Sequence, residues 1–327
     1  AEGDAAVRRV MVGAQRAGLN VARVWAHSTN ARRPLLVRPG VYDESVFRAL
    51  DGVVAEAERA GLRVVLSLAD HWKYSGGTAQ MLDWSTTAEP RTAQFPPPGT
   101  GEGDADRSGW SAQRREYEDR RAAQFYVDSH AREIYREHVR AVLLRRNAVT
   151  GRLYKDDPTI LAFDLLNEPR CQTDAQPDCL ARLDTWVREQ ALFLKSIDNR
   201  HLVTLGSEGF WGPEDPSARF NPGQGWAAAS GQDFVRNLLG SALDFGTVHV
   251  WPDNWAHNDT DFVARFLRQH VADAQERAHK PVVLEEFGKK LGRSREGVVA
   301  HDAHDQRAEA FASVLDLAEE LHSPGSP

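Results

Sequence analysis

The chain has 327 residues, of which 41% are hydrophobic and 27% are charged, a composition typical of a globular protein with a sizeable core. A formal net charge of −7, without a long run of lysine or arginine, argues against a nucleic-acid partner. No segment is apolar for long enough to span a bilayer, so we expect no membrane partner. The sequence shows no basic and then apolar leader, so we expect any signal peptide to lie outside this chain.

The N-terminal part of the sequence alternates between helix and strand patterns. Apolar residues at helical spacing predict helices over residues 4–17 and 43–60, and a glycine follows each of them. Short apolar runs predict strands over residues 19–25 and 62–68.

Residues 85–121 interrupt this alternation. They contain a stretch rich in proline and glycine, residues 95–103, followed by a densely charged run. Such a composition predicts a long surface insertion that can be mobile, rather than a linker between domains. We therefore expect one domain over residues 1–327 that carries this insertion.

The remaining sequence returns to the alternation. Helices are predicted over residues 128–147, 178–197, 233–243, 259–278 and 303–321. Strands are predicted from residue 159 to the turn Asn167-Glu168-Pro169 and over residues 201–207, 245–250 and 281–285. Strands that alternate with helices and are too apolar to face water indicate a parallel sheet covered by helices.

Both a doubly wound sheet and a closed barrel fit this order of elements. No glycine-rich phosphate turn follows any strand, and polar or aromatic residues end every strand rather than one or two of them. Active sites of barrels draw residues from the ends of many strands. We therefore predict an α/β fold of the TIM (β/α)8-barrel type, of which six strands are evident.

Carboxylates stand at the exits of two predicted strands. Glu168 follows the strand that begins at residue 159, and Glu285 and Glu286 end the last strand. Because neighbouring side chains on a strand point to opposite faces, we expect only one of these adjacent glutamates to point into the barrel mouth. The adjacent pair alone also fits an exposed strand end, and Glu168 alone fits a helix-capping or salt-bridged carboxylate, but together they fit a two-carboxylate glycoside hydrolase.

Further polar and aromatic residues lie near the strand ends. Arg23 lies within an apolar strand, where a guanidinium needs a carboxylate partner. His249 lies at a strand exit, although a lone histidine is more often a core residue than a catalytic one. Aromatic faces at a barrel mouth suit a sugar chain. Five of the nine tryptophans fall at or just beyond strand ends: Trp25, Trp72, Trp211, Trp251 and Trp255.

Two cysteines and two histidines lie close enough in the sequence to form a disulfide and a metal site, respectively. Cys171 and Cys179 either form a local disulfide, which would imply an oxidising compartment, or remain free. His301 and His304 could serve a metal by their spacing, but they lie in the polar approach to the last helix, and we interpret them as solvated. We expect no metal and no cofactor.

Seven segments, in order from about residue 18 to 290, resemble the plant and fungal endo-β-1,4-mannanases of glycoside hydrolase family 5. The segments are Gly18-Leu-Asn-Val-Ala-Arg-Val-Trp25, Arg38-Pro-Gly-Val-Tyr-Asp-Glu44, Asp156-Asp-Pro-Thr-Ile160, Asn167-Glu-Pro-Arg-Cys171, Gly206-Ser-Glu-Gly-Phe210, His249-Val-Trp-Pro-Asp253 and Glu286-Phe-Gly288. Asn-Glu-Pro alone is shared by many barrel glycosidases. Asn-Glu-Pro-Arg-Cys together with Ser-Glu-Gly-Phe is specific to the mannanase group.

The resemblance implies a role for each matching residue. Glu168 matches the acid/base, Glu286 the nucleophile, and Asn167 the residue that holds the sugar 2-hydroxyl. A retaining mechanism then predicts that the two carboxyl groups lie about 5–5.5 Å apart. We expect Glu168 to be protonated in the resting site, because the nearby ionised Glu286 should raise the pKa of Glu168.

The other matching residues are expected around these two carboxylates. Arg23 and His249 match groups that orient and charge-balance them, and Arg170 and Glu208 match contacts to mannose on the leaving-group side. With the tryptophans, the predicted substrate-binding residues are Arg23, Trp25, Trp72, Asn167, Arg170, Glu208, His249 and Trp251.

The sequence departs from the family pattern at three places. Trp251 replaces a tyrosine that usually hydrogen-bonds the nucleophile, and Asp70-His71 replaces a common Asn-Asn pair. Only six strands are evident, and the first and eighth strands of the family are expected to lie beyond the two ends of this chain. We expect such an open sheet to be poorly soluble or weakly active on its own.

These observations predict a secreted, monomeric glycosidase that cleaves β-1,4-mannan, glucomannan or galactomannan internally with retention of configuration. A β-1,4-glucanase or a transglycosylase on the same scaffold remains an alternative. A non-catalytic mannan-binding protein, or a defective fragment that keeps the motifs, is another.

Overall fold

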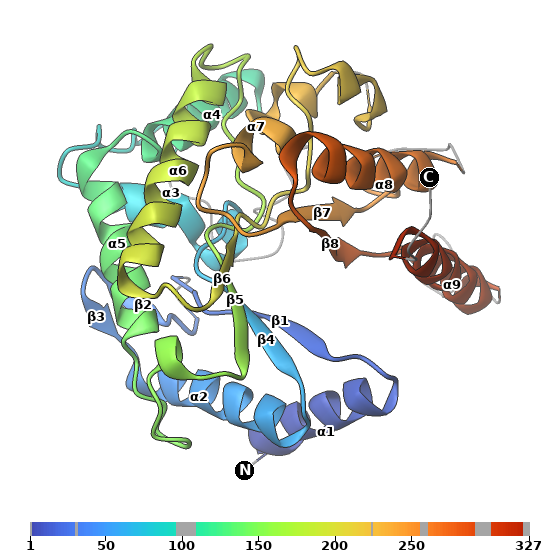
Figure 1. Cartoon of the computed structure of the whole chain (residues 1–327). Coiled ribbons are helices and arrows are strands. Elements are labelled where there is room, and N and C mark those ends of the chain that lie inside the picture. The colour runs from blue at the N-terminus through green and yellow to red at the C-terminus, as the bar shows by residue number, and fades with distance from the viewer. Residues whose placement is uncertain are drawn as a thin grey trace.

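The computed structural model describes residues 2–29, 32–95, 109–223, 225–255, 261–291 and 302–322. Parallel strands are present at all six predicted positions (Figure 1). They are β1 (Val21–Trp25), β4 (Arg63–Ser67), β5 (Ile160–Asp164), β6 (Leu202–Thr204), β7 (Gly246–Val250) and β8 (Val282–Phe287). Backbone ladders join β1, β4, β5 and β6 in that order, and a separate ladder joins β7 to β8.

Hydrogen bonds outside the ladders hold β7 beside β6. The backbone N–H of Asp244 donates to the carbonyl of Val203 at 2.7 Å, and Thr204 Oγ1 donates to the carbonyl of Phe245 at 2.9 Å. The six strands therefore follow one another in chain order from β1 to β8. Because parallel strands with the same direction end at one edge, the residues after each strand gather on one side of the molecule.

Helices follow the strands in the sequence, as the alternation predicts. Their bounds are α1 (Glu2–Arg16), α2 (Glu44–Arg59), α3 (Gly77–Asp83), α4 (Ala112–Phe125), α5 (Ser129–Leu143), α6 (Cys179–Ile197), α7 (Phe234–Leu238), α8 (Phe262–Asp273) and α9 (Ala303–His322). Aspartates cap three of them: the Asp43 carboxylate accepts from the N–H of Ser45 and the Asp128 carboxylate from that of Ala131, each at 2.8 Å, and the Asp233 carboxylate accepts from that of Arg236 at 3.1 Å.

Aromatic residues join α5 and α6 behind the sheet. The ring of Trp186 on α6 lies 5.1 Å from that of Tyr135 on α5, centroid to centroid, and both residues are fully buried. The Tyr135 hydroxyl donates to the carbonyl of Leu165 at 2.8 Å. This bond ties the helix layer to the end of β5, from which the turn Asn167-Glu168-Pro169 departs.

The second half of the segment predicted as a surface insertion, residues 85–121, contains a helix in the structure. Residues 112–121 belong to α4, which packs against α3, and neither helix was predicted. The charges that suggested a solvated segment are paired within the protein. Glu118 is buried and binds Arg91 Nη1 at 2.6 Å, and Arg121 binds Asp83. Residues 96–108 lie outside the described part.

Two shorter elements also differ from the predictions. A hairpin of β2 (Leu36–Arg38) and β3 (Val41–Tyr42) was missed because its strands are shorter than the four-residue runs that a sequence pattern can identify. Helix α7 ends at Leu238 instead of residue 243, because Leu239 is extended and Gly240 has a φ of +64°. The helix predicted from residue 259 begins at Phe262 in the described part.

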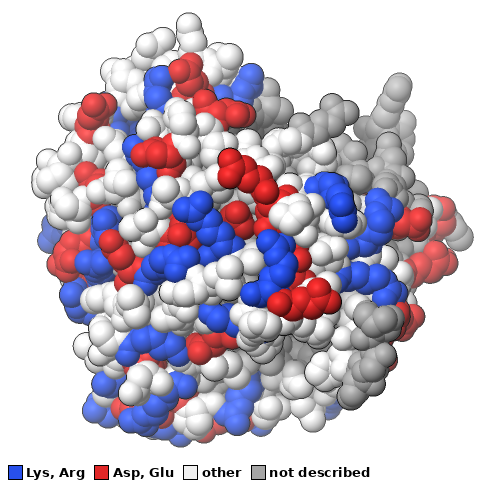
Figure 2. Space-filling view, turned by 45° about the horizontal axis from the view of Figure 1, so that its top comes forward, with Lys and Arg blue, Asp and Glu red and all other residues white. Residues whose placement is uncertain are grey.

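Basic and acidic side chains are interspersed over the face of the molecule in Figure 2. Charged residues of the described part also form ion pairs, such as Arg145 with the exposed Glu44 and with the buried Asp51, each at 2.7 Å. Within the described residues, no helix combines the length and the apolar character needed to cross a bilayer.

Candidate active site

A cleft of about 830 Å³ opens at the carboxyl ends of the strands. Eight of the ten predicted site residues line it, and the other two, Arg23 and His249, lie directly behind the carboxylates. The lining residues are Trp25, Trp72, Tyr74, Asn167, Glu168, Arg170, Glu208, Trp226, Trp251, Asn254, Trp255 and Glu286.

Glu168 is held in an unusual backbone conformation just after β5. Its φ is +47°, a value that residues other than glycine rarely adopt. Its backbone N–H donates to the carbonyl of Gly206 at 2.8 Å. Gly206 has no room for a side chain, since a Cβ atom would lie 2.9 Å from the carbonyl oxygen of Leu166. The carboxylate accepts from Trp72 Nε1 on one oxygen and pairs with His249 on the other.

The two glutamates of β8 both reach the site, contrary to the expectation that only one points inward. The register between β7 and β8 shifts just before His249, which pairs with Glu286 and leaves Glu285 as the extra residue. Such a bulge breaks the strict alternation of a strand. As a result, Glu285 Oε1 lies 3.2 Å from Arg23 Nε, and Glu286 also pairs with Arg23.

Arg23 is the cation shared by the carboxylates of the site. Its Nε donates to Asp164 Oδ2 at 2.7 Å, and its Nη2 donates to Asn167 Oδ1 at 2.9 Å. Burial lowers the pKa of Arg23, but the carboxylates of Asp164, Glu285 and Glu286 outweigh it and raise this pKa above its usual value. The prediction that carboxylates must answer this guanidinium is confirmed.

The amide of Asn167 is fixed from two sides. Its oxygen accepts from Arg23, and its nitrogen donates to Asp70 Oδ1 at 3.0 Å. Asp70 also accepts from Ser75 Oγ at 2.9 Å and from the N–H of Trp72 at 3.1 Å. Burial raises the pKa of Asp70 to about 7, although these hydrogen bonds favour its ionised form. Asp70 thus orients Asn167 from behind and is not part of the cleft lining.

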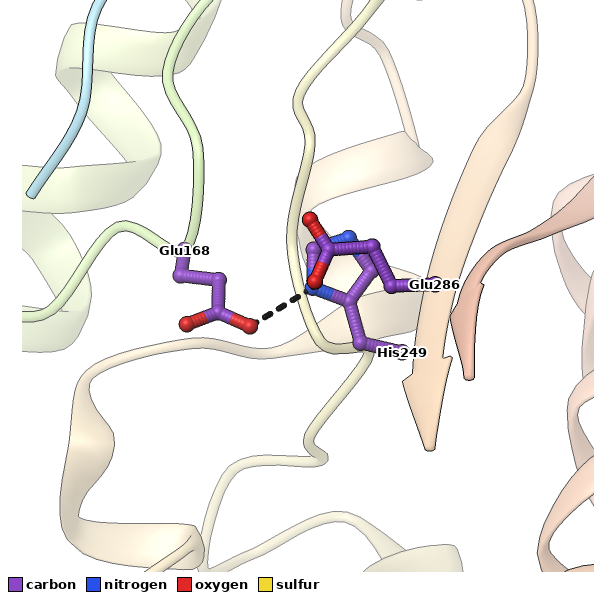
Figure 3. A group of neighbouring side chains, drawn as sticks. All are labelled: Glu168, His249 and Glu286. Carbon is purple, nitrogen blue, oxygen red and sulfur yellow. Dashed lines mark hydrogen bonds and ion pairs between the residues drawn. The ribbon is translucent and has the colours of Figure 1, made fainter. Parts of the chain in front are cut away.

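Glu168, His249 and Glu286 converge on one point (Figure 3). One carboxylate oxygen of each glutamate and one ring nitrogen of His249 all lie within 4.8 Å of one another. These three residues have ligand types that could hold a metal, but both nitrogens of His249 are engaged by carboxylates, Nδ1 by Glu168 and Nε2 by Glu285. His249 is therefore held between carboxylates at both of its ring nitrogens.

The resting protonation of the site differs from the prediction. Burial raises the pKa of Glu168, but the hydrogen bond and charge of His249 outweigh burial and lower this pKa to about 2. Burial lowers the pKa of His249, yet its carboxylate partners raise it to about 10. The expected raised pKa of Glu168 is thus wrong, because the hydrogen bond and the charge of His249 act on Glu168 itself.

Arg170 and Glu208 form a second charged group beside Glu168. The Arg170 guanidinium pairs with the fully buried Glu208 carboxylate. The same guanidinium lies 5.6 Å from the ring centre of Trp72 and 5.2 Å from that of Trp226. A polar pair framed by aromatic faces suits a sugar, whose hydroxyls need partners and whose ring faces need apolar contact.

The predicted tryptophans line the cleft with one exception, and two further aromatic residues, Tyr74 and Trp226, line it as well. The Trp251 indole donates to Glu286 Oε2 at 3.2 Å, the contact that the resemblance assigns to a tyrosine in the family. Trp211 is fully buried, donates to Asp273 at 2.9 Å and is not part of the cleft, so its predicted place at the mouth is wrong. Trp226 lines the cleft and was missed, because its loop carries no strand signal.

The predicted cysteine and histidine alternatives are also resolved in part. Cys171 and Cys179 form a disulfide, which closes the loop that follows the turn of Glu168. His304 is exposed on α9, and His301 lies outside the described residues.

Comparisons with known proteins place this site in a family. Residues 5–322 match the family described as GH family 5 beta-mannosidase-like. Mannan endo-1,4-beta-mannosidase 5 of Arabidopsis thaliana is 37% identical over 277 residues, which cover 83% of this chain and 57% of that protein. Mannan endo-1,4-beta-mannosidase 2 of Oryza sativa subsp. japonica is 37% identical over 307 residues, which cover 92% of this chain and 61% of that protein.

A solved structure shows the same fold. The hyperthermostable endo-1,4-beta-D-mannanase from Thermotoga petrophila RKU-1 matches with a TM-score of 0.72 and 27% identity over 96% of this chain and 81% of that one. This likeness confirms the predicted barrel class. The chain spans only about three-fifths of the length of the two plant relatives, 57% and 61%. Its family is nevertheless shown: the chain belongs to the beta-mannosidase-like group of glycoside hydrolase family 5.

Proposed function

We propose that the protein is an endo-acting glycoside hydrolase that cleaves β-1,4-mannosidic bonds with retention of configuration. One observation carries the proposal: a carboxylate oxygen of Glu168 and one of Glu286 lie within 4.8 Å of each other in an aromatic-lined cleft. Retaining glycosidases keep their carboxyl groups about 5–5.5 Å apart, whereas inverting ones leave about 6.5–9.5 Å for a water molecule.

In the first step, a Glu286 oxygen forms a bond to the anomeric carbon while the bond to the leaving oxygen breaks. The leaving oxygen takes the electron pair of that bond and a proton from Glu168. Glu168 in turn receives the proton held on His249 Nδ1, 2.8 Å from its Oε1. The negative charge of Glu286 disappears in the ester, so the site no longer needs the positive charge of His249 nearby.

In the second step, a water molecule attacks the anomeric carbon and the ester bond to Glu286 breaks. Glu168 accepts the water proton and returns it to His249, which restores the resting charges of all three groups. The net charge of Glu168, His249 and Glu286 is the same before and after each step. This constancy suits a buried site, where an uncompensated charge is costly.

The surrounding residues hold this geometry. Arg23 draws Glu286 and Asn167 together, and Asn167, fixed by Asp70, presents its amide beside Glu168. In the resemblance this amide holds the sugar 2-hydroxyl, a contact that strengthens in the transition state. Arg170 and Glu208 provide the polar contacts for the leaving sugar, with Trp72 and Trp226 around them.

The relatives support the proposed polymer substrate, and the disulfide supports the proposed location of the protein. The plant relatives are named mannan endo-1,4-beta-mannosidases, and a β-mannan chain with ring faces and hydroxyls fits the cleft. The Cys171–Cys179 bond supports secretion into an oxidising compartment. The protein acts as a monomer, without a nucleic-acid or membrane partner.

The test is product release from β-1,4-mannan, glucomannan and cellulose, with the oligosaccharides resolved by chromatography. The proposal predicts a range of short oligosaccharides from mannan and much less from cellulose. Glu168→Gln and Glu286→Gln should each remove this activity while leaving mannan binding. Faster release from cellulose would support a glucanase, and binding without release from any polymer would support a non-catalytic protein.

A further inference from the structure

Gln232 is a buried residue that was not predicted as part of the site. Its side chain contacts both the turn that holds Glu168 and the carboxylate of Glu208. It follows the short helical turn η5 (Ala228–Ser230) and is 1% exposed. Its segment is tied to the disulfide loop, because the N–H of Cys171 donates to the carbonyl of Ser230 at 2.8 Å. Gly231 makes this approach possible: its φ is +82°, and a Cβ atom would overlap the carbonyl oxygen of Cys171.

The amide group of Gln232 has a defined orientation. Its Nε2 donates to the carbonyl oxygen of Pro169 at 3.0 Å and to Glu208 Oε2. Both partners are acceptors only, so the reverse orientation would set the amide oxygen against two other oxygens. The two N–H groups of one amide thus join the backbone next to Glu168 to the carboxylate of Glu208.

The two acceptors, the carbonyl oxygen of Pro169 and the carboxylate of Glu208, belong to segments that determine where Glu168 and Arg170 lie. Pro169 directly follows Glu168, whose φ of +47° is kept only if its surroundings hold it. Glu208 pairs with Arg170, and both line the cleft beside Glu168. A shift of either acceptor moves the leaving-group contacts relative to the acid.

We propose that Gln232 is a positioning residue that couples the leaving-group contacts of Glu208 and Arg170 to the placement of Glu168. This inference rests on the proposed function, because it assigns the Glu208 side of the cleft to the leaving sugar. The binding energy of that sugar then acts through Gln232 to keep Glu168 at the bond to be broken.

Two kinds of substrate separate this role from a general contribution to folding. An oligosaccharide needs both a bound leaving sugar and a proton from Glu168. A dinitrophenyl β-mannoside needs neither for bond cleavage, since its phenolate leaves without protonation. Loss of Gln232 should therefore affect the first substrate much more than the second.

The first experiment uses Gln232→Met, which keeps the shape of the side chain and removes both N–H donors. We expect kcat/KM for mannohexaose to fall about ten- to a hundredfold, as for loss of a hydrogen bond to a charged group. For the aryl substrate we expect a change below about threefold, within the usual range for a site with no direct contact. Equal losses on both substrates, or no loss on either, would overturn the proposal.

Gln190→Met is the matched control. Gln190 is also fully buried and accepts from Arg136 Nε at 3.0 Å, but it lies on α6, away from the cleft. The same chemical change there should lower the thermal unfolding temperature without changing the ratio of the two activities.

A second variant, Gln232→Glu, adds a pH readout. Protonated, the new carboxyl group donates one hydrogen bond, but ionised it repels Glu208 and the carbonyl of Pro169. The readout is kcat/KM for mannohexaose divided by kcat/KM for the aryl mannoside. We expect this ratio, relative to that of the wild type, to rise as the pH is lowered. A ratio independent of pH would contradict the positioning role.

The panel of polymers tested on the wild type keeps the two proposals separate. If cellulose is cleaved faster than mannan, the proposed substrate is wrong. The Gln232 experiments are then performed with cellohexaose and an aryl β-glucoside, and the same ratios decide the inference.

Discussion

The Nδ1 atom of His249 lies 2.8 Å from Oε1 of Glu168. The other ring nitrogen of His249 lies 3.2 Å from Glu285, so the ring is a fully buried cation between carboxylates. Glu168, the proposed acid/base, and the proton that it would transfer are therefore on different side chains in the resting site. Burial opposes both pKa shifts, and the hydrogen bond between the two groups is the largest contribution that favours them: the pKa of Glu168 falls to about 2 and that of His249 rises to about 10, to which Glu285 also contributes.

His249→Gln tests whether His249 holds the proton that Glu168 transfers, through the pH dependence of kcat/KM. In the wild type, the alkaline limb of kcat/KM should follow the loss of the His249 proton, whose pKa is raised to about 10. In the variant, Glu168 must hold the proton itself. We expect kcat/KM on mannan to fall at least about a hundredfold and the alkaline limb to move down by more than about one pH unit. An unchanged alkaline limb would show that His249 is not the proton source.

The same pair should stabilise the folded protein over a defined pH window. The lowered pKa of Glu168 contributes stability above its unfolded value of about 4.3, and the raised pKa of His249 contributes below its unfolded value of about 6.5. The contribution is therefore complete between these values, is lost as the pH falls toward 2, and is lost as the pH rises through 10.

Asp70→Asn should stabilise the protein at neutral and alkaline pH. The folded pKa of Asp70 is about 7, above the unfolded value, so the folded state binds this proton more tightly and loses stability as the pH rises from about 4 to 7. Asparagine keeps an acceptor for Asn167 and donates to Ser75 in place of the charge. We expect a gain of about 2–4 kcal/mol in unfolding free energy at pH 8 relative to pH 5.

Urea unfolding of the wild type and Asp70→Asn at both pH values measures this difference. Ser75→Ala is a matched control, because it removes a hydrogen bond from the same carboxylate but leaves a group that titrates. If Asp70→Asn raised the free energy of unfolding by the same amount at pH 5 and pH 8, ionisation of Asp70 would not destabilise the folded protein, and the prediction would be wrong.

Trp251 and Gly288 should act as a unit. The indole donates to Glu286 at 3.2 Å, and its ring lies so close to Gly288 that a Cβ atom there would overlap it. Trp251→Phe removes the donor, and Gly288→Ala displaces the ring. We expect each to lower kcat about tenfold, the order of one hydrogen bond to a charged group.

The double variant decides whether the two effects share one cause. Phenylalanine is smaller than tryptophan and leaves room for the new methyl group, so Gly288→Ala should have little further effect in the Trp251→Phe background. Losses of kcat that multiply in the double variant would contradict this packing relationship.

The disulfide should contribute to stability through the short loop that it closes. Cys171 and Cys179 are eight residues apart. Replacing both by serine should lower the free energy of unfolding by about 2.5 kcal/mol, the loop-entropy value for this length. A reductant should destabilise the wild type by a similar amount and leave the variant unaffected. Equal sensitivity of both proteins to the reductant would contradict this.

The sequence predicts the strands and the principal carboxylates well, for a physical reason. Buried parallel strands require apolar runs, and a carboxylate such as Glu168 or Glu286 at the exit of such a run needs a function or a partner. Arg23 could be identified as paired by the same reasoning, before any partner was known.

The missed features depend on contacts between distant segments. The bulge that brings Glu285 to Arg23 is a matter of register between β7 and β8, which no single strand encodes. Helix α4 appears solvated in sequence because the partners of Glu118 lie elsewhere in the chain. Gln232 carries no pattern at all, since its two acceptors become neighbours only in the folded protein.

The central claim is retention through Glu286, and the most direct test is the anomeric configuration of the first product. Mannohexaose is cleaved by a high concentration of enzyme in deuterated water, and proton NMR follows the anomeric signals before mutarotation. The placement of Glu168 and Glu286 oxygens within 4.8 Å predicts that the β-anomer appears first. Initial release of the α-anomer would show inversion and would contradict the account.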